Sequence, residues 1–149
     1  MADLQTLYRQ VIMDHYKNPL NKGLTHSDKY KFLHLNNPSC GDDMNVEALV
    51  EDGVVKDIKH DGKGCSICCS SASVMSDTLI GKSKDEALRT IENFYLLLEG
   101  KTLSDDDQEL LGEAIAYQGV CQFPARIKCA SLSWKAIERI IRGEDNESK

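Results

Sequence analysis

The stretch MNVEALVEDGVVKDIKH, at residues 44–60, limits the fold more than any other part of the chain. Two apolar runs flank the dipeptide Asp52-Gly53, a pair that favours the two-residue turn of a β-hairpin. We therefore predict paired strands over residues 44–51 and 54–60. The alternating stretch KYKFLHLNN that precedes them predicts an additional edge strand.

A helical period replaces the strand pattern after this hairpin. We predict one helix over residues 66–80 and a long last helix that begins at a proline, because proline suits the first helical position. The remaining helices are expected to begin at side chains that accept a backbone N–H. These expected caps and starts are Asp3, Ser83, Ser104 and Pro124. The length fits a single domain over residues 1–149, with a flexible tail from about residue 143.

The acidic balance of the chain limits its partners. It carries 18 basic and 24 acidic residues, a net charge of −6, which argues against binding to nucleic acid or to an anionic membrane. The N-terminal stretch MADLQTLYRQVIMDHYKN mixes charges with apolar residues and resembles neither a signal peptide nor a membrane span. We therefore expect a cytoplasmic protein in which the six cysteines are thiols or metal ligands.

Three cysteines and one aspartate stand at or near the ends of predicted elements. Cys40 and Asp42 are two residues apart, so in an extended chain they point to the same side and can reach one metal. Cys65 directly precedes a predicted helix, whose N-terminus stabilises a thiolate. Cys129 lies in the second turn of the last helix. Three sulfurs and one oxygen suit tetrahedral Zn²⁺, but these residues alone leave open a loop with incidental acids.

Other cysteines and histidines allow competing interpretations. Cys65 and Cys68 form a CxxC pair that is compatible with redox or metal chemistry. The small residues around Cys68 and Cys69 instead favour a tightly packed helix in which cysteine acts as a small apolar residue. Cys121 is expected to be an incidental loop thiol. No histidine has the spacing of a metal ligand. His15 is expected on a helix face, and three others are expected on strand or loop surfaces, namely His26, His34 and His60.

Two basic residues flank the start of the last predicted helix. In the simplest interpretation, Arg126 and Lys128 are surface charges. In the alternative, they lie beside the site, where Lys128 is next to Cys129 and offsets the negative charge of several thiolates.

Three ordered motifs resemble the NifU N-terminal/IscU-like family of iron–sulfur cluster assembly proteins. They are NNPSCGD, GKGCSICCSSASVMSD and FPARIKCASLSWKAIE, and the N-terminal stretch LYRQVIMDHYKNPLNKG is similar to the family as well. The resemblance implies that Cys40, Cys65 and Cys129 are the three essential cysteines and that Asp42 is the adjacent aspartate. It also implies an α+β fold, a small antiparallel β-sheet with helices packed on one face, which agrees with the elements predicted above.

Two features depart from the scaffold members of this family. Scaffold members have histidine directly before the third cysteine, where this chain has Lys128. The stretch AIAYQGVCQFPARIK ahead of that cysteine is also longer than expected of a scaffold. Both features are similar to the SufU branch, which is associated with zinc and with accepting sulfur from a SufS-type cysteine desulfurase.

The leading hypothesis is therefore a zinc-binding sulfur acceptor in iron–sulfur cluster biogenesis. Zn²⁺ would be held by Cys40, Asp42, Cys65 and Cys129, and Cys40 would take the persulfide sulfur. The protein would then act with the desulfurase as a zinc-dependent sulfurtransferase, although the sequence leaves its status as an enzyme open. The alternatives are a scaffold for a labile [2Fe–2S] cluster, a structural zinc module that serves as an interaction domain and, more distantly, a CxxC oxidoreductase.

Overall fold

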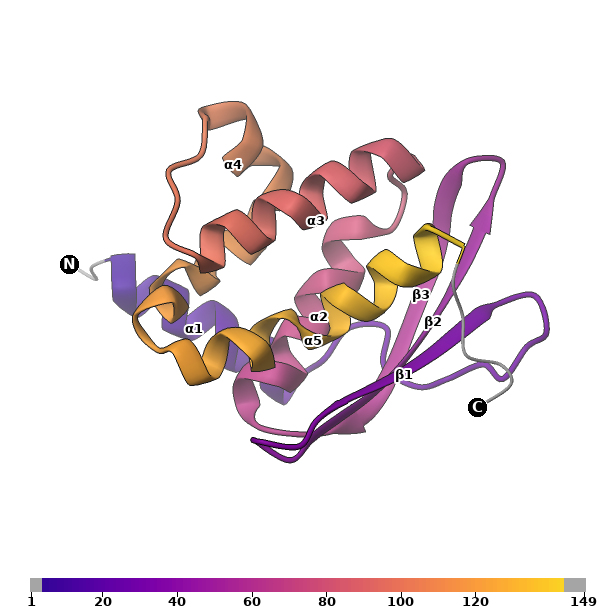
Figure 1. Cartoon of the computed structure of the whole chain (residues 1–149), viewed down its shortest axis with the longest axis horizontal. Helices are drawn as coiled ribbons and strands as arrows, with labels where there is room; N and C mark the ends of the chain where they lie inside the picture. Colours follow the sequence, from indigo (N-terminus) through magenta and orange to yellow (C-terminus); the bar gives the residue numbers. More distant parts are fainter. Residues whose placement is uncertain (1–3, 144–149) are drawn as a thin grey trace.

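The computed structural model describes residues 4–143. They form an antiparallel sheet in the order β1-β2-β3 with helices packed on it (Figure 1), which confirms the predicted α+β class. Asp3, the expected cap, and the expected tail beyond residue 143 lie outside the described residues. The elements are α1 (Leu4–Lys17), β1 (Lys31–Asn37), β2 (Asp42–Glu51), β3 (Val54–Lys63), α2 (Ser66–Leu79), α3 (Lys84–Leu98), α4 (Asp105–Leu111), the 3-10 helix η1 (Gly112–Gln122) and α5 (Pro124–Ile141).

Strands β2 and β3 form the predicted hairpin. Asp52 and Gly53 both have left-handed backbone conformations, with φ of 55° and 74°, as a tight two-residue hairpin turn requires. The strands are longer than predicted because pairing continues past the apolar runs to Asp43 and Lys63. β1 pairs with the other side of β2 and is the predicted edge strand.

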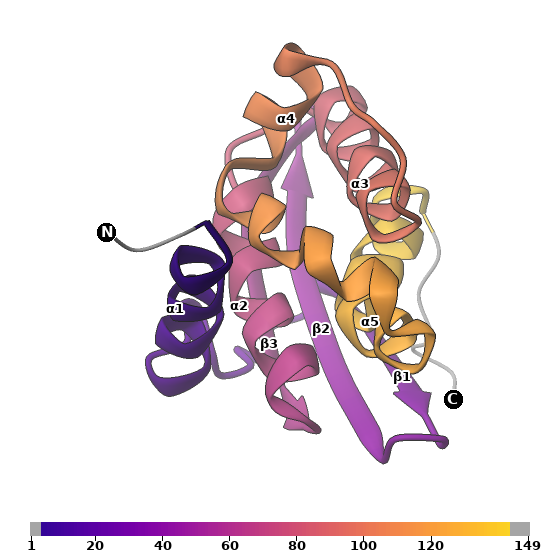
Figure 2. The same cartoon turned by 90° about the vertical axis from the view of Figure 1, so that its left-hand side faces the viewer.

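Helices α2 and α5 cover one face of the sheet, and α3 and η1 pack over them (Figure 2). Trp134 of α5 stacks on Phe94 of α3, with ring centroids 3.9 Å apart. The indole N–H of Trp134 also donates to Ser71 Oγ of α2 at 2.9 Å. One buried aromatic side chain therefore joins three helices at the centre of the core.

The helix starts follow the predicted local signals. Ser83 and Ser104 each accept a hydrogen bond from the backbone N–H three residues further on, at 3.1 and 3.2 Å, and α5 begins at Pro124. The 3-10 helix η1 was not predicted. It contains Cys121, so the expectation that this thiol lies in a loop was wrong.

Helix α1 packs against α2 and η1 rather than against the sheet. Its buried His15 bonds Ser73 Oγ at 2.7 Å and Glu113 Oε1 at 2.9 Å, which ties the helix to both neighbours. Leu4 and Leu7, which share its apolar period, are 54% and 48% exposed. Within residues 4–143, no helix combines the length and apolar character that a membrane crossing requires.

His60 was expected at a surface, and this expectation was wrong because its side chain is buried. Its Nε2–H donates to the Leu20 carbonyl at 2.8 Å. The segment after α1 lies along β3, and Lys22 forms a parallel bridge with His60. The alternation of a strand sequence contains no information about this distant segment, which covers the strand. His26 is exposed and His34 is half-buried.

Candidate metal centre

Three segments that are far apart in the sequence meet at the candidate centre. Cys40 lies in the turn between β1 and β2, and Asp42 is the first residue of β2. Asn37 pairs with Asp42 across the two strands, so this turn is held closed at its base. Cys65 directly precedes α2, and Cys129 lies in α5.

Three of the four predicted ligands converge on one point. One ligand atom from each of Cys40, Asp42 and Cys129 lies within 4.8 Å of the other two. Zn–S bonds of about 2.3 Å place two tetrahedral sulfurs about 3.8 Å apart, so a small contraction would bring these atoms around a single ion. The Cys65 sulfur is not in this close group, but the Cys65 backbone N–H donates to Asp42 Oδ1 at 3.0 Å.

A glycine makes room for that contact. A Cβ atom at Gly64 would lie 2.6 Å from Asp42 Oδ1 and 3.3 Å from the Asp42 Cα. Any side chain here would displace the carboxylate that the Cys65 N–H holds. The residues around Gly64 give no sign of this steric role, because the carboxylate that needs the space belongs to Asp42 in β2.

Two further groups that the sequence analysis missed line the site. The Asn37 side-chain amide lies 3.5 Å from Asp42 Oδ2 and 3.9 Å from Cys129 Sγ. The Ala125 carbonyl lies 3.9 Å from Cys40 Sγ and 3.8 Å from Cys129 Sγ. Asn37 stands in the motif NNPSCGD, so its proximity to Cys40 in the chain was the available signal. A main-chain carbonyl leaves no signal in the residue type.

Burial divides the site into two halves. Asp42 and Cys129 are buried, whereas Cys40 and Cys65 are half-buried. Burial raises the pKa of the Cys129 thiol, and contacts with Asp42, Cys40 and Cys65 raise it further. A cysteine binds a metal as its thiolate, so this donor set needs a cation to offset the charge that deprotonation creates.

Of the two basic residues, Arg126 faces the sulfurs. Interactions with Cys65 and Cys129 raise the pKa of its guanidinium, and an arginine side chain is always protonated, so a positive charge lies at the edge of the site. Lys128 is exposed on the same helix. The sequence favoured Lys128 as the source of the compensating positive charge. In the structure Arg126, about one helical turn before Cys129, supplies that charge.

The remaining thiols differ in their surroundings. Cys68 is fully buried, which confirms the packing interpretation, and burial raises the pKa of its thiol. It packs with Met44, Ala72 and Leu132 behind the candidate centre. Cys69 is only half-buried, so that interpretation holds for Cys68 and not for its neighbour.

Comparison with known proteins gives consistent matches. Residues 7–130 match the family model described as NifU-like N terminal domain. The zinc-dependent sulfurtransferase SufU of Bacillus subtilis (strain 168) is 46% identical over 144 residues, which are 97% of this chain and 95% of that protein. The iron-sulfur cluster assembly scaffold protein IscU of Streptococcus pyogenes serotype M1 is 38% identical over 146 residues, 98% of this chain and 89% of that protein.

A solved structure has the same fold. It is the crystal structure of a putative iron-sulfur cluster assembly scaffold protein for the SUF system from Fervidobacterium islandicum AW-1. The TM-score is 0.77 at 32% sequence identity, and the match covers 91% of this chain and 97% of that one. The similarity therefore extends over nearly the whole fold, and residues 7–130, which match the family model, include all the segments that form the candidate centre.

Proposed function

The chain belongs to the NifU-like N terminal domain family, and on this premise we propose that it is a zinc-dependent sulfur acceptor in iron–sulfur cluster biogenesis. The observation that carries the proposal is the convergence of Cys40, Asp42 and Cys129 within 4.8 Å. Cys65 is joined to them through Asp42. The proposal takes residues 1–149 as one domain, as expected from its length.

The donor set fits zinc. Three sulfurs and one carboxylate oxygen are ligands that Zn²⁺ accepts in a tetrahedron, and Cys40, Asp42, Cys65 and Cys129 supply them. When bound, zinc provides the positive charge that keeps the thiols deprotonated near neutral pH. Asp42 is held by hydrogen bonds from the Cys65 N–H and the Asn37 amide, and such outer contacts orient ligating carboxylates.

Cys40 is the acceptor in this proposal. It is half-buried in a turn, whereas Cys129 is buried in a helix, so a partner can approach Cys40 without opening the core. The Cys40 thiolate attacks the outer sulfur of the partner's persulfide. The sulfur–sulfur bond of the donor breaks as a new one forms on Cys40, and the donor cysteine leaves as a thiolate. No external oxidant or reductant is needed.

Arg126 assists this exchange by its charge. Four anionic ligands carry −4 against +2 from zinc, so the filled site has an excess of −2. The Arg126 guanidinium lies near Cys65 and Cys129 and lowers the repulsion between this site and an incoming persulfide anion. We propose a SufS-type cysteine desulfurase as the donor, and the cytoplasmic location expected from the sequence stays a prediction.

The test is sulfur transfer to defined cysteines. Zinc-loaded protein is incubated with a SufS-type desulfurase and cysteine, and the peptides are analysed by mass spectrometry after the persulfides have been trapped. We expect the additional sulfur on Cys40, and we expect Cys40→Ser to abolish transfer. Cys121→Ser is the matched control and should transfer normally. Sulfur found on Cys121 or Cys69 in place of Cys40 would contradict the proposal.

A scaffold for a labile [2Fe–2S] cluster is the second candidate, because several relatives carry the name IscU and that role. Lys128 argues against it, since a protonated amine cannot ligate iron. Anaerobic reconstitution with iron and sulfide separates the two functions. A cluster that forms in high yield on the native protein and is transferred intact would favour the scaffold.

A further inference from the structure

A cavity of about 480 Å³ lies beside the candidate metal centre and is separate from it. Gly64 and Met44 line the cavity, and Met44 also packs against Cys129 and Leu132 behind the metal centre. A space of this size holds a small organic molecule. Five polar side chains from different parts of the chain also line the cavity, and these are Tyr16, Lys22, His60, Lys63 and Cys69.

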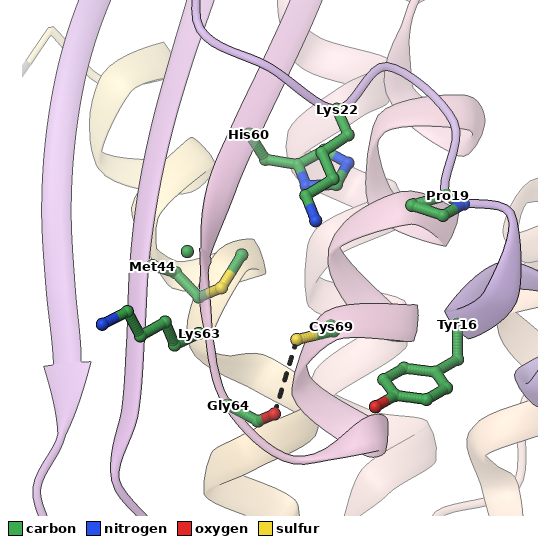
Figure 3. A pocket seen from close by; sticks show the side chains of 9 residues that line it. Tyr16, Pro19, Lys22, Met44, His60, Lys63, Gly64 and Cys69 are labelled. Atoms are coloured by element: carbon green, nitrogen blue, oxygen red, sulfur yellow. Dashed lines mark hydrogen bonds between the residues drawn. The ribbon is translucent and has the colours of Figure 1, made fainter.

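Lys22 places a positive charge in this cavity. The bridge between Lys22 and His60 holds the lysine backbone against β3, and Figure 3 shows its ammonium group directed into the space between His60 and Cys69. The second lysine of the lining, Lys63, points away from that space in the same view. Lys22 therefore offers a positive charge to an anion that enters the cavity.

His60 offers an acceptor that the protein itself leaves unused. Its Nε2–H donates to the Leu20 carbonyl, so in the neutral ring Nδ1 has the free lone pair. Burial lowers the pKa of His60, which favours that neutral ring. Among residues 4–143, no hydrogen bond to Nδ1 is formed. This nitrogen is not sealed in the core, and His60 lines the cavity, so a ligand that carries an N–H or O–H group can donate to it there.

Cys69 completes the cavity with a thiol. It is half-buried. Its S–H donates to the Gly64 carbonyl, with Sγ 3.6 Å from the oxygen (Figure 3). Burial raises the pKa of this thiol, while the positive charge of Lys22 acts in the opposite direction. A bound anion with a reactive sulfur would thus be held next to a protein sulfur.

We propose that this cavity selects small disulfides that carry a carboxylate and joins them to Cys69. The carboxylate pairs with Lys22, and an N–H or O–H group of the ligand donates to His60 Nδ1. The Cys69 thiolate attacks the nearer ligand sulfur. The ligand's sulfur–sulfur bond breaks, a mixed disulfide forms on Cys69, and a small thiol leaves with the proton that Cys69 gave up. This reaction is independent of the sulfur-acceptor function.

Three disulfides of different charge test the proposal. The zinc-loaded full-length chain is treated at low salt with anionic dithiodiglycolate, neutral 2-hydroxyethyl disulfide or cationic cystamine. Adducts on Cys69 are followed by mass spectrometry with fragmentation, because Cys65 and Cys68 share its tryptic peptide. The same chain unfolded in urea gives the intrinsic rate at which each of the three reagents reacts with Cys69. Each rate measured on the folded chain is divided by the rate of the same reagent on the unfolded chain.

In the folded protein we expect the anionic reagent to react about fivefold faster than the neutral one, and the cationic reagent to react more slowly than both. Lys22→Gln should remove this preference, whereas the matched control Lys63→Gln should retain it. Cys69→Ser should lose the adduct. Equal normalised rates for the three reagents, a preference that survives in Lys22→Gln, or no adduct on Cys69 would each overturn the proposal.

Discussion

Replacing Gly64 by alanine tests whether Asp42 is held in place for metal binding. The new methyl carbon would lie 2.6 Å from Asp42 Oδ1, whereas ordinary contact begins at 3.4 Å, so the two atoms must separate by 3.4 − 2.6 = 0.8 Å. The backbone at Gly64 is not left-handed, so alanine adds no conformational strain there. The effect of the substitution is therefore steric and is directed at the carboxylate.

The cost follows from the hydrogen bond that this shift disturbs. The Cys65 N–H donates to Asp42 Oδ1 at 3.0 Å, and hydrogen bonds to charged groups contribute about 1.5–3 kcal/mol. Since about 1.4 kcal/mol corresponds to a tenfold change in affinity, loss of this bond should weaken zinc binding about 10–100-fold. That range agrees with the effect of removing outer contacts from metal ligands, about 10–100-fold in affinity.

Zinc affinity is measured by competition with a chromophoric chelator on Gly64→Ala and on a matched glycine variant. Gly119→Ala is the control, because its added carbon would meet only Gln5 Oε1, at 3.7 Å. Circular dichroism of both metal-free variants checks that they are folded. If Gly64→Ala is folded and binds zinc as tightly as Gly119→Ala, Asp42 does not ligate the metal in the proposed way.

Three other perturbations have defined outcomes. Removing zinc by chelation should lower the melting temperature, and adding it back should restore it, because a ligand that binds the native state stabilises it; an unchanged melting temperature would argue against a bound metal that joins these segments. Arg126→Gln should slow sulfur transfer more than Lys128→Gln while both retain zinc, since Arg126 faces the sulfurs, and the reverse order would refute this assignment. The Tyr30 hydroxyl donates to Asp57 Oδ2 at 2.6 Å, and this bond raises the pKa of Tyr30 to about 12. A phenol whose folded pKa is raised contributes stability that is full below its ordinary pKa of about 10 and is lost as pH rises through about 12. Absorbance titration of Asp57→Asn should show Tyr30 ionising closer to its ordinary value.

The elements that could be predicted are those whose cause is local. The Asp52-Gly53 turn depends on two residues that tolerate left-handed backbone, and both adopt it. Ser83 and Ser104 cap helices through hydrogen bonds that span three residues. The four candidate ligands were found from short motifs and from their resemblance to a family. Such signals survive in a sequence because neighbouring residues are sufficient to produce them.

The features that were missed depend on contacts between distant segments. His60 is buried because the segment after α1 returns to β3 and places Leu20 and Lys22 against it. The role of Gly64, which lies between β3 and α2, appears only when Asp42 of β2 is placed beside it. Periodicity along a single strand or helix reports its own faces and contains no information about which segment will cover them.

The separation of the candidate ligands into buried and accessible members has a mechanistic consequence. Asp42 and Cys129 lie in β2 and α5 and are buried, so moving either one would disturb the packing between the sheet and its covering helix. Cys40 lies in the turn between β1 and β2 and is half-buried, so it can move without unfolding either strand. Exchange at Cys40 can therefore leave the other ligands in place, whereas four equally buried ligands would require partial unfolding for each turnover.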